Sequence, residues 1–126
     1  MGKFWLGIGI LAIFLVLGFG VSAAMDMTHN AIAATLDTAA ESALSGDLKT
    51  GQQQALSAKQ AWEKSWHSSA TVADHGPMDE IDGLFAQLSV YSRAGNTGDF
   101  AACCTQISML VQAMSEAHSL TWWNLL

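Results

Sequence analysis

The sequence predicts an all-α protein with an N-terminal transmembrane helix followed by a four-helix up-and-down bundle. An uncharged apolar run opens the chain. Beyond it, apolar residues recur at three- and four-residue steps, which is the spacing of amphipathic helices. β-branched residues are scattered and never alternate with polar ones, so no segment is predicted as a strand. Two tetratricopeptide-like helical hairpins are the alternative arrangement of the same helices.

Residues 4–21 form the predicted membrane-spanning segment. They contain no charged residue, no Pro, no Asn and no Gln. An α-helix of this length rises about 27 Å, close to the roughly 30 Å hydrocarbon core of a bilayer. We therefore expect membrane lipid to surround residues 4–21, with Trp5 at the membrane–water interface. On this basis residues 1–24 are the anchor and residues 25–126 are the helical domain.

The distribution of charge predicts the orientation in the membrane. Lys3 immediately precedes the apolar run, whereas the next basic residue is Lys49. The positive-inside rule therefore keeps the N-terminus in the cytoplasm and makes residues 25–126 extracytoplasmic, in a single-pass protein of the cell membrane. That domain carries four basic residues against all eleven acids of the chain. An acidic surface repels phosphate backbones, so no nucleic-acid partner is expected.

A cleaved signal peptide is the other interpretation of the N-terminal segment. Residues 21–23 (Val-Ser-Ala) offer small side chains of the kind that signal peptidase prefers. The apolar run is longer than the core of a typical signal peptide, which has about 7 to 15 residues, and this favours a retained anchor. In both cases the helical domain lies outside the cytoplasm.

The first two helices of the domain are predicted to meet at Gly46. Nothing in residues 22–30 requires a break, so the first helix can continue directly from the membrane span. Gly46 is suited to end this helix and Asp47 to cap the next one. The second helix should fade at residues 67–71, and Gly51 is a weak point near its start. The predicted buried stripes are Ile32, Leu36, Ala39, Ala40 and Ala43, followed by Leu48, Ala55, Leu56, Trp62 and Trp66.

The third and fourth helices follow the clearest break in the chain. Residues 74–77 (Asp-His-Gly-Pro) hold the only Pro, which suits the first turn of a helix, and the acids after it suit a helix N-terminus. Residues 95–98 end the third helix, and an apolar tail, residues 120–126, follows the fourth. Ser45–Leu48 and Thr97–Phe100 both place a Gly-Asp-apolar turn between helices, which indicates paired hairpins. The predicted stripes are Met78, Ile81, Leu84, Phe85, Leu88 and Tyr91, then Phe100, Cys103, Cys104, Ile107, Leu110, Val111 and Met114.

The best candidate for a metal site is His75 with Asp79 and Asp82, beside Glu80. Carboxylate oxygens and an imidazole can hold a divalent cation. Helical spacing brings His75 near Asp79 only if the helix starts early, and Pro77 argues against a regular helix through His75. The alternative is that the acids compensate the helix dipole and His75 bonds to a neighbouring turn. No established metal signature, catalytic grouping or cofactor site is present in the sequence.

Cys103 and Cys104 are adjacent, and neighbours on a helix point about 100° apart, which disfavours a disulfide between them. Their place in the apolar stripe predicts two small core residues. A link between two chains and a soft-metal site are the alternatives. The other histidines, His29, His67 and His118, are expected to be solvated or partly buried.

The tryptophans of the domain fall into two pairs. Trp62 and Trp66 lie one turn apart and are predicted to pack in the bundle. Trp122 and Trp123 are adjacent, so both cannot face the same core. This second pair is predicted either to cap the bundle or to bind a partner, since exposed indoles favour such contacts.

Short segments along the whole chain carry a family resemblance: Lys3–Trp5, Ser45–Asp47, Ala61–Lys64, Asp74–His75, Met78–Asp82, residues 84–91 and residues 119–126. In this order they resemble the domain of unknown function 4363 family, small membrane-anchored helical proteins of Firmicutes. Members are usually richer in Glu and Lys than this chain, which is rich in Ala, Ser and Gln. No activity is assigned to the family, so the resemblance implies location and fold and supplies no catalytic residues.

Together these observations predict a non-enzymatic, membrane-anchored protein-interaction or scaffold module of the bacterial envelope. Its partner would be another envelope protein or a second copy of the chain. The alternative is an extracytoplasmic sensor or carrier that binds a ligand or metal through His75, Asp79 and Asp82, or through the two thiols.

Overall fold

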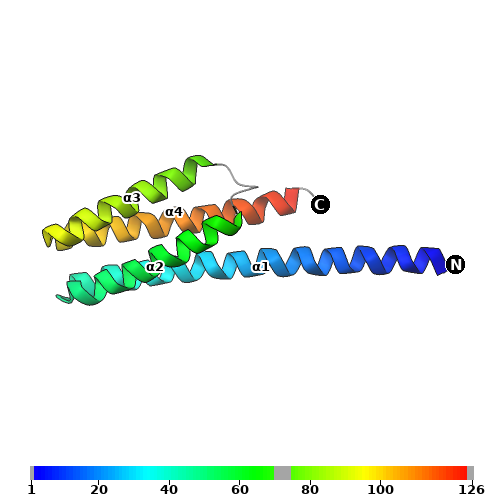
Figure 1. Ribbon diagram of the computed structural model, residues 1–126, viewed down its shortest axis with the longest axis horizontal. Coiled ribbons are helices and arrows are strands. Elements are labelled where there is room, and N and C mark those ends of the chain that lie inside the picture. Colours follow the sequence, from blue (N-terminus) through cyan, green and yellow to red (C-terminus); the bar gives the residue numbers. More distant parts are fainter. Residues whose placement is uncertain (1, 70–74, 125–126) are drawn as a thin grey trace.

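The computed structural model describes the backbone of residues 2–69 and 75–124, and the side chains of residues 2–17, 27–65 and 76–116. Over these residues the chain forms helices and no strand, so the all-α prediction is confirmed. The helices are α1 (Gly2–Leu44), α2 (Leu48–Ser69), α3 (His75–Ala94) and α4 (Thr97–Asn124) (Figure 1).

The helices alternate in direction and form two hairpins, α1–α2 and α3–α4 (Figure 1). The hairpins join because α1 packs along both α2 and α4, while α3 packs along α4. Helices α2 and α3 touch each other much less. The bundle is therefore a row, in the order α2, α1, α4, α3, that closes only weakly between its two outer helices.

Two glycines with positive φ end α1 and α3. Gly46 (φ 95°) and Gly95 (φ 68°) adopt the left-handed conformation that a side chain disfavours. After Gly46, the Asp47 carboxylate accepts hydrogen bonds from the backbone N–H of Thr50 (3.2 Å) and from its hydroxyl (2.6 Å), as a helix cap. Asn96 follows Gly95, and its side-chain amide donates a hydrogen bond to the carboxylate of Asp99 in the first turn of α4. Gly46 and Gly95 are therefore the equivalent positions of the two turns. The predicted equivalence of Ser45–Leu48 with Thr97–Phe100 is wrong, because α4 has already begun at Thr97.

Small residues let α1 approach its neighbours closely. Ala33, Ala39 and Ala43 are completely buried, and the hydroxyl of Ser108 on α4 donates a hydrogen bond to the backbone oxygen of Ala33 (3.2 Å). Larger side chains fill the remaining space between the helices. They are Ile32, Leu36, Trp62, Met78, Ile81, Leu84, Phe85, Leu88, Phe100, Ile107 and Val111.

Gly51 on α2 is needed for this close approach, which corrects its interpretation as a weak point. A Cβ built on Gly51 would lie 2.8 Å from the backbone oxygen of Ala39 and 3.3 Å from Cε1 of Phe100. Both α1 and α4 therefore leave no room for a side chain there. The helix propensity lost at Gly51 is offset by the close packing of α1 and α4 against it.

Several other expectations about the helices require correction. Leu56, placed in the buried stripe of α2, is 55% exposed. Helix α3 begins at His75, so His75 is helical and Pro77 lies in the first turn, where a missing N–H is tolerated. Residues 120–124 continue α4 and are not a separate tail. The side chains of Trp66, Trp122 and Trp123 lie outside the described part of the structure.

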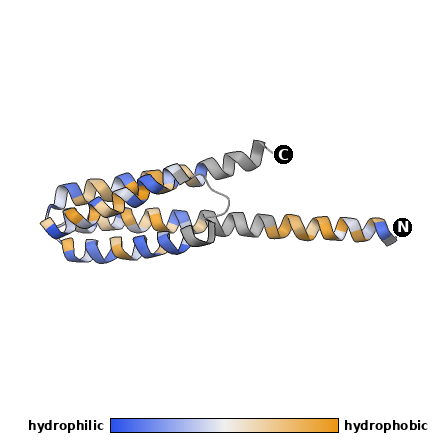
Figure 2. Cartoon of the chain, turned by 45° about the horizontal axis from the view of Figure 1, so that its top comes forward, coloured by the Kyte–Doolittle hydropathy of each residue, from blue (hydrophilic) through white to orange (hydrophobic). Residues whose placement is uncertain are grey.

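Helix α1 continues without a break from the N-terminal apolar run into the bundle, as predicted. Its 43 residues extend over about 64 Å at roughly 1.5 Å per residue. Figure 2 shows the apolar N-terminal part protruding beyond the other helices. The large apolar side chains of residues 4–17 are exposed. No helix in the described portion of the chain is both long enough and apolar enough to span a membrane.

The close approach at Gly51 yields a test with a matched control. Gly51→Ala should lower the free energy of unfolding by about 1–3 kcal/mol through overpacking, although Ala is the better helix former. Gly83→Ala should raise it by up to about 1 kcal/mol, because nothing lies within 4 Å of the added Cβ on α3. Urea denaturation followed by circular dichroism measures both. Equal effects of the two substitutions would contradict the packing role of Gly51.

Candidate functional site

A groove lies between α2 and α3, which contact each other only sparsely. It has a volume of about 240 Å³, and we call it the α2–α3 groove. Its buried apolar residues are Ala55, Phe85, Leu88 and Phe100, and Leu56 is exposed on the α2 side. The residues that line it are Gln52, Ala55, Leu56 and Lys59 of α2, Phe85, Leu88, Ser89 and Ser92 of α3, and Phe100 of α4.

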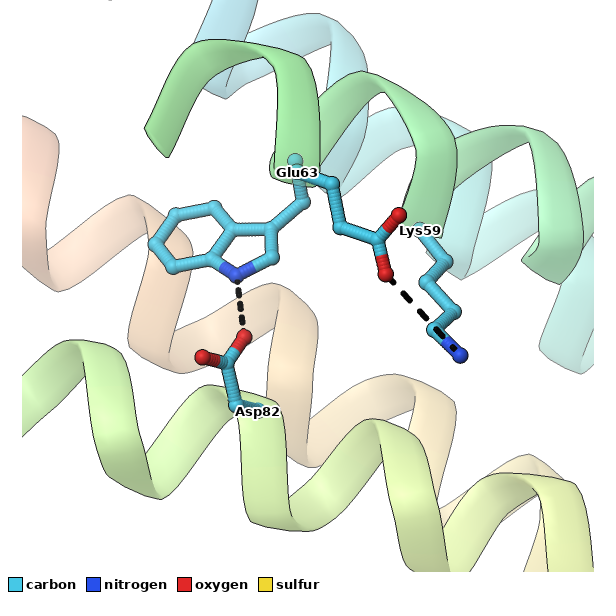
Figure 3. A network of polar contacts seen from close by, with 4 residues as sticks. Lys59, Glu63 and Asp82 are labelled. Atoms are coloured by element: carbon cyan, nitrogen blue, oxygen red, sulfur yellow. Dashed lines mark hydrogen bonds and ion pairs between the residues drawn. The ribbon is translucent and has the colours of Figure 1, made fainter. Parts of the chain in front are cut away.

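Two side-chain hydrogen bonds connect α2 and α3 across this face. The Gln52 side-chain amide donates to the backbone oxygen of Ser92 (3.1 Å). Toward the other ends of the helices, the indole Nε1–H of Trp62 donates to a carboxylate oxygen of Asp82 (2.9 Å) (Figure 3). Because the helices are antiparallel, these bonds lie about ten residues apart on each helix, a separation of about 15 Å. They hold α2 and α3 at a fixed spacing, with the groove between them.

Trp62 connects three helices at one end of the bundle. Its side chain is 1% exposed, and its N–H is satisfied by Asp82 of α3, as a buried indole requires. The ring of His29 on α1 lies 6.2 Å from the Trp62 ring, centroid to centroid, at an interplanar angle of 41°. His29 is buried, which corrects the expectation of a solvated or partly buried imidazole, and its ring packs against Trp62.

The charged residue of the groove is a lysine. Lys59 forms an i,i+4 ion pair with Glu63 at 4.0 Å, and both side chains are largely solvated (Figure 3). Such exposed pairs contribute about 0.3–0.5 kcal/mol. No carboxylate belongs to the described residues that line the groove. Lys59 is therefore the one charged residue among the described residues that line the groove, and Glu63 lies beside it as its ion-pair partner.

The predicted metal ligands are only partly described. Asp79 is exposed on α3, and Asp82 is engaged by the Trp62 indole. The side chain of His75 lies outside the described residues. Among the side chains that the structure places, no group of three His, Cys, Asp or Glu could hold a metal ion. Binding through His75, Asp79 and Asp82 stays a prediction.

The two cysteines are buried free thiols. The Cys103 thiol donates a hydrogen bond to the backbone oxygen of Leu84 (3.3 Å). Burial raises the pKa of Cys103. Burial, followed by the neighbouring Cys103 and Asp37, raises the pKa of Cys104 to about 12. A thiol that holds its proton is a poor nucleophile and a poor metal ligand, which agrees with the predicted role as small core residues.

A second groove, of about 300 Å³, lies between α1 and α2. Small and hydroxyl side chains dominate its walls, including Ala31, Thr35 and Ser57. The Thr35 hydroxyl donates to the backbone oxygen of Ala31 (2.8 Å), so it is already satisfied within α1. No charged residue is among the described residues that line this groove.

These features define a class of protein: a small bundle of two helical hairpins whose first helix protrudes as an apolar extension. The family model for the Domain of unknown function (DUF4363) matches residues 19–125, and the chain belongs to this family. The match includes the whole bundle and begins within α1. The family resemblance seen in the sequence is confirmed. No curated protein and no solved structure matches the chain.

The α2–α3 groove was not predicted from the sequence. The acids of α3 suit a helix N-terminus, and the sequence gives no sign that one of them meets Trp62. The available signal is the spacing: Gln52 and Trp62 on α2 match Ser92 and Asp82 on α3 in reverse order. Antiparallel neighbours place such residues opposite each other. Leu56, in contrast, fits the apolar stripe and gives no indication of its exposure.

The bond between Trp62 and Asp82 is testable by a double-mutant cycle. Trp62→Phe combined with Asp82→Ala should reveal a coupling free energy of about 1 kcal/mol, the net value of a hydrogen bond of this kind. As a control, Trp62→Phe with Asp79→Ala should be additive, since Asp79 lies one turn earlier on α3. Chemical denaturation of the four proteins in each cycle gives both values. A coupling near zero for Asp82 would show that the bond does not form.

The buried thiols predict a loss of stability at alkaline pH. The unfolded chain releases the Cys104 proton near the ordinary pKa of 9.0, whereas the folded chain retains it to about 12. The contribution is complete below pH 9.0 and is lost as the pH rises toward 12. Its slope reaches at most about 1.4 kcal/mol per pH unit. Denaturation of the unmodified chain and of Cys104→Ala across this range isolates the effect, and parallel profiles would refute it.

Proposed function

We propose that this protein is a membrane-anchored, non-enzymatic protein-interaction module of the bacterial envelope. It is a single-pass protein in which the N-terminus is cytoplasmic and residues 25–126 are extracytoplasmic. Residues 4–21 hold it in the lipid. The bundle binds a second envelope protein, with the α2–α3 groove as its binding face.

The protruding part of α1 carries the membrane proposal. Phe4, Trp5 and Phe14 are each at least 70% exposed, and the large apolar side chains between them are exposed on all sides of the helix. A helix that is apolar all round belongs inside a protein core or a bilayer. No other described helix packs on residues 4–17, and the glycines there have nothing within 4 Å. Lipid is the surrounding that fits this surface.

The orientation follows from the flanking charges. Lys3 precedes the apolar part of α1, whereas the bundle begins with neutral and acidic residues. The positive-inside rule then keeps Lys3 in the cytoplasm. Acidic residues predominate in the bundle, which favours a protein partner over nucleic acid or an anionic lipid surface.

Partner binding is supported by the open face between α2 and α3. The groove joins an exposed leucine to buried aromatic side chains. Anchor side chains of a partner commonly enter such pockets. Trp122 and Trp123, near the end of α4, remain a second predicted contact with the partner.

A sensor or carrier of a small ligand is the second candidate function. The groove between α1 and α2, at about 300 Å³, reaches the lower limit of typical small-molecule pockets, which span about 300–1,000 Å³. None of the described residues that line it is charged, whereas such sites use a few polar or charged groups to orient a ligand. We therefore rank it below partner binding.

A charge placed in the apolar part of α1 tests the anchor. Leu11→Lys should weaken membrane retention about 100-fold, because a lysine near the centre of a spanning helix costs about 2.5–3.5 kcal/mol. Leu44→Lys, at an exposed leucine at the other end of α1, should have no effect. The measurement is the membrane-bound fraction after alkaline extraction. Full retention of the Leu11→Lys chain, or a cytoplasmic reporter fused after Leu126, would reject the proposed location.

A further inference from the structure

Helix α4 extends to the level of the apolar part of α1. The two helices are antiparallel, and the bond from the Ser108 hydroxyl to the backbone oxygen of Ala33 (3.2 Å) sets their register. Both helices rise about 1.5 Å per residue, so positions after Ser108 on α4 match positions equally far before Ala33 on α1. Trp122 is therefore level with about residue 19 of α1, within the apolar run of residues 4–21.

Helix α2 ends, and helix α3 begins, short of this level. The bonds from Ser42 to Gln54 (2.9 Å) and from Cys103 to Leu84 (3.3 Å) set the registers of these helices. By the same rise per residue, both stop at the level of about residues 27–29 of α1. Figure 1 shows α4 reaching farther toward the N-terminus of α1 than α2 and α3 do. Over its last 15 Å or so, α4 is thus accompanied by α1 alone among the described helices.

The charged residues of α1 and α4 stop at a common level. Asp26 is the first charged residue of α1 after Lys3, and Glu116 is the last charged residue of α4. The register places Glu116 level with Asp26 to within about one residue. Beyond that level, residues 4–25 and residues 117–124 contain no Asp, Glu, Lys or Arg. Two neighbouring helices that lose their charges together are typical of helices that enter the same apolar layer.

The residue types at the end of α4 suit the surface of a bilayer. Trp122 and Trp123 follow each other in this segment. Indoles concentrate at membrane–water interfaces, where the ring has apolar surroundings and the N–H has contact with water. Adjacent positions lie about 100° apart around a helix, so α1 can cover one of the two positions but not both. Trp5 lies at the opposite end of residues 4–21 and suits the other interface.

Continuity with α1 favours lipid over a protein at this level. In the proposed function lipid surrounds the turns of α1 that α4 reaches. A partner protein that docked on the same turns would have to enter the same layer. The acidic residues of the bundle repel phosphate headgroups, whereas residues 117–124 contain none.

We propose that residues 117–124 of α4 bind the extracytoplasmic surface of the membrane, with Trp122 and Trp123 between the lipid headgroups and the hydrocarbon. The bundle then has two attachments to the bilayer, α1 through it and α4 at its surface. Contact with lipid replaces the contact of this tryptophan pair with a partner protein. The inference rests on the proposed anchor, because the level reached by α4 lies in lipid only if residues 4–21 span the bilayer.

Fluorescence quenching by brominated lipid tests this contact on the full-length chain in phosphatidylcholine vesicles. Bromine on the acyl chains near the headgroups quenches indoles that touch the lipid. The test chain carries Trp5→Phe and Trp66→Phe, which leaves Trp62 and the pair Trp122 and Trp123. Brominated vesicles should lower its emission about two-fold or more relative to unbrominated vesicles, because the pair lies at the interface.

Two matched chains separate the pair from the other tryptophans. Adding Trp122→Phe and Trp123→Phe to the test chain leaves Trp62, which is buried in the bundle, so the quenching should disappear. A chain that retains Trp5 and Trp62 should be quenched through Trp5 at the opposite interface, which reports the insertion of α1. Circular dichroism of each chain in the vesicles checks that the helices form.

Photocrosslinking in the native cell distinguishes lipid from protein at the same position. The photoreactive amino acid p-benzoylphenylalanine replaces Trp123, and in a control chain it replaces Met109, which is exposed on α4 within the bundle. We expect a lipid adduct at Trp123 and none at Met109. A crosslinked protein at Trp123, whether another protein or a second copy of the chain, would overturn the inference.

The quenching results separate this inference from the proposed anchor. An unquenched pair, in a chain series where Trp5 is quenched, would reject the contact of α4 with lipid and leave the anchor in place. If Trp5 is also unquenched, both are rejected. Quenching of Trp62 in the chain that lacks the pair would show that lipid reaches the bundle, which would contradict a contact limited to the end of α4.

Discussion

The close approach of α1 to α2 and α4 determines the rest of the bundle. It depends on alanines on α1 and on Gly51, whose missing side chain leaves space for Ala39 and Phe100. Phe100 is also part of the α2–α3 groove. The contact that holds the hairpins together thus sets the position of a groove residue. The helices pack closely in the pairs α1–α2, α1–α4 and α3–α4, whereas α2 and α3 make few contacts and leave an open face between them.

Among the described residues, several polar groups in the interior form hydrogen bonds to a neighbouring helix. The Ser108 hydroxyl bonds to the backbone of α1, the Cys103 thiol bonds to the backbone of α3, and the Trp62 N–H bonds to Asp82. Each of these contacts joins two different helices. Since an unpaired buried donor is costly, they favour one relative placement of the helices. Apolar packing alone would allow helices with so many alanines to slide.

The helices were predictable, whereas the groove was not. Gly46, Asp47 and the 3.6-residue stripes are local signals, and they gave the class and order of the helices. Gly51 and Leu56 were misread because a stripe indicates which side of a helix is apolar but not how closely a neighbour approaches. The pairing of Trp62 with Asp82 depends on the register between α2 and α3, and matching spacings on two helices indicate this register only once the helices are known to be neighbours. The side chains of His75, Trp122 and Trp123 lie outside the described part of the structure.

Helix α1 passes without a break from its apolar extension into the packed core, so the orientation of the bundle depends on the number of residues between these two parts. At 3.6 residues per turn, adding one residue between the two parts would rotate the bundle by about 100° around the axis of α1 and move it by about 1.5 Å along that axis. The direction in which the α2–α3 groove faces is therefore fixed relative to the side chains of the apolar extension. Because the backbone hydrogen bonds of α1 continue without a break, a rotation of the extension about the helix axis would turn the bundle with it.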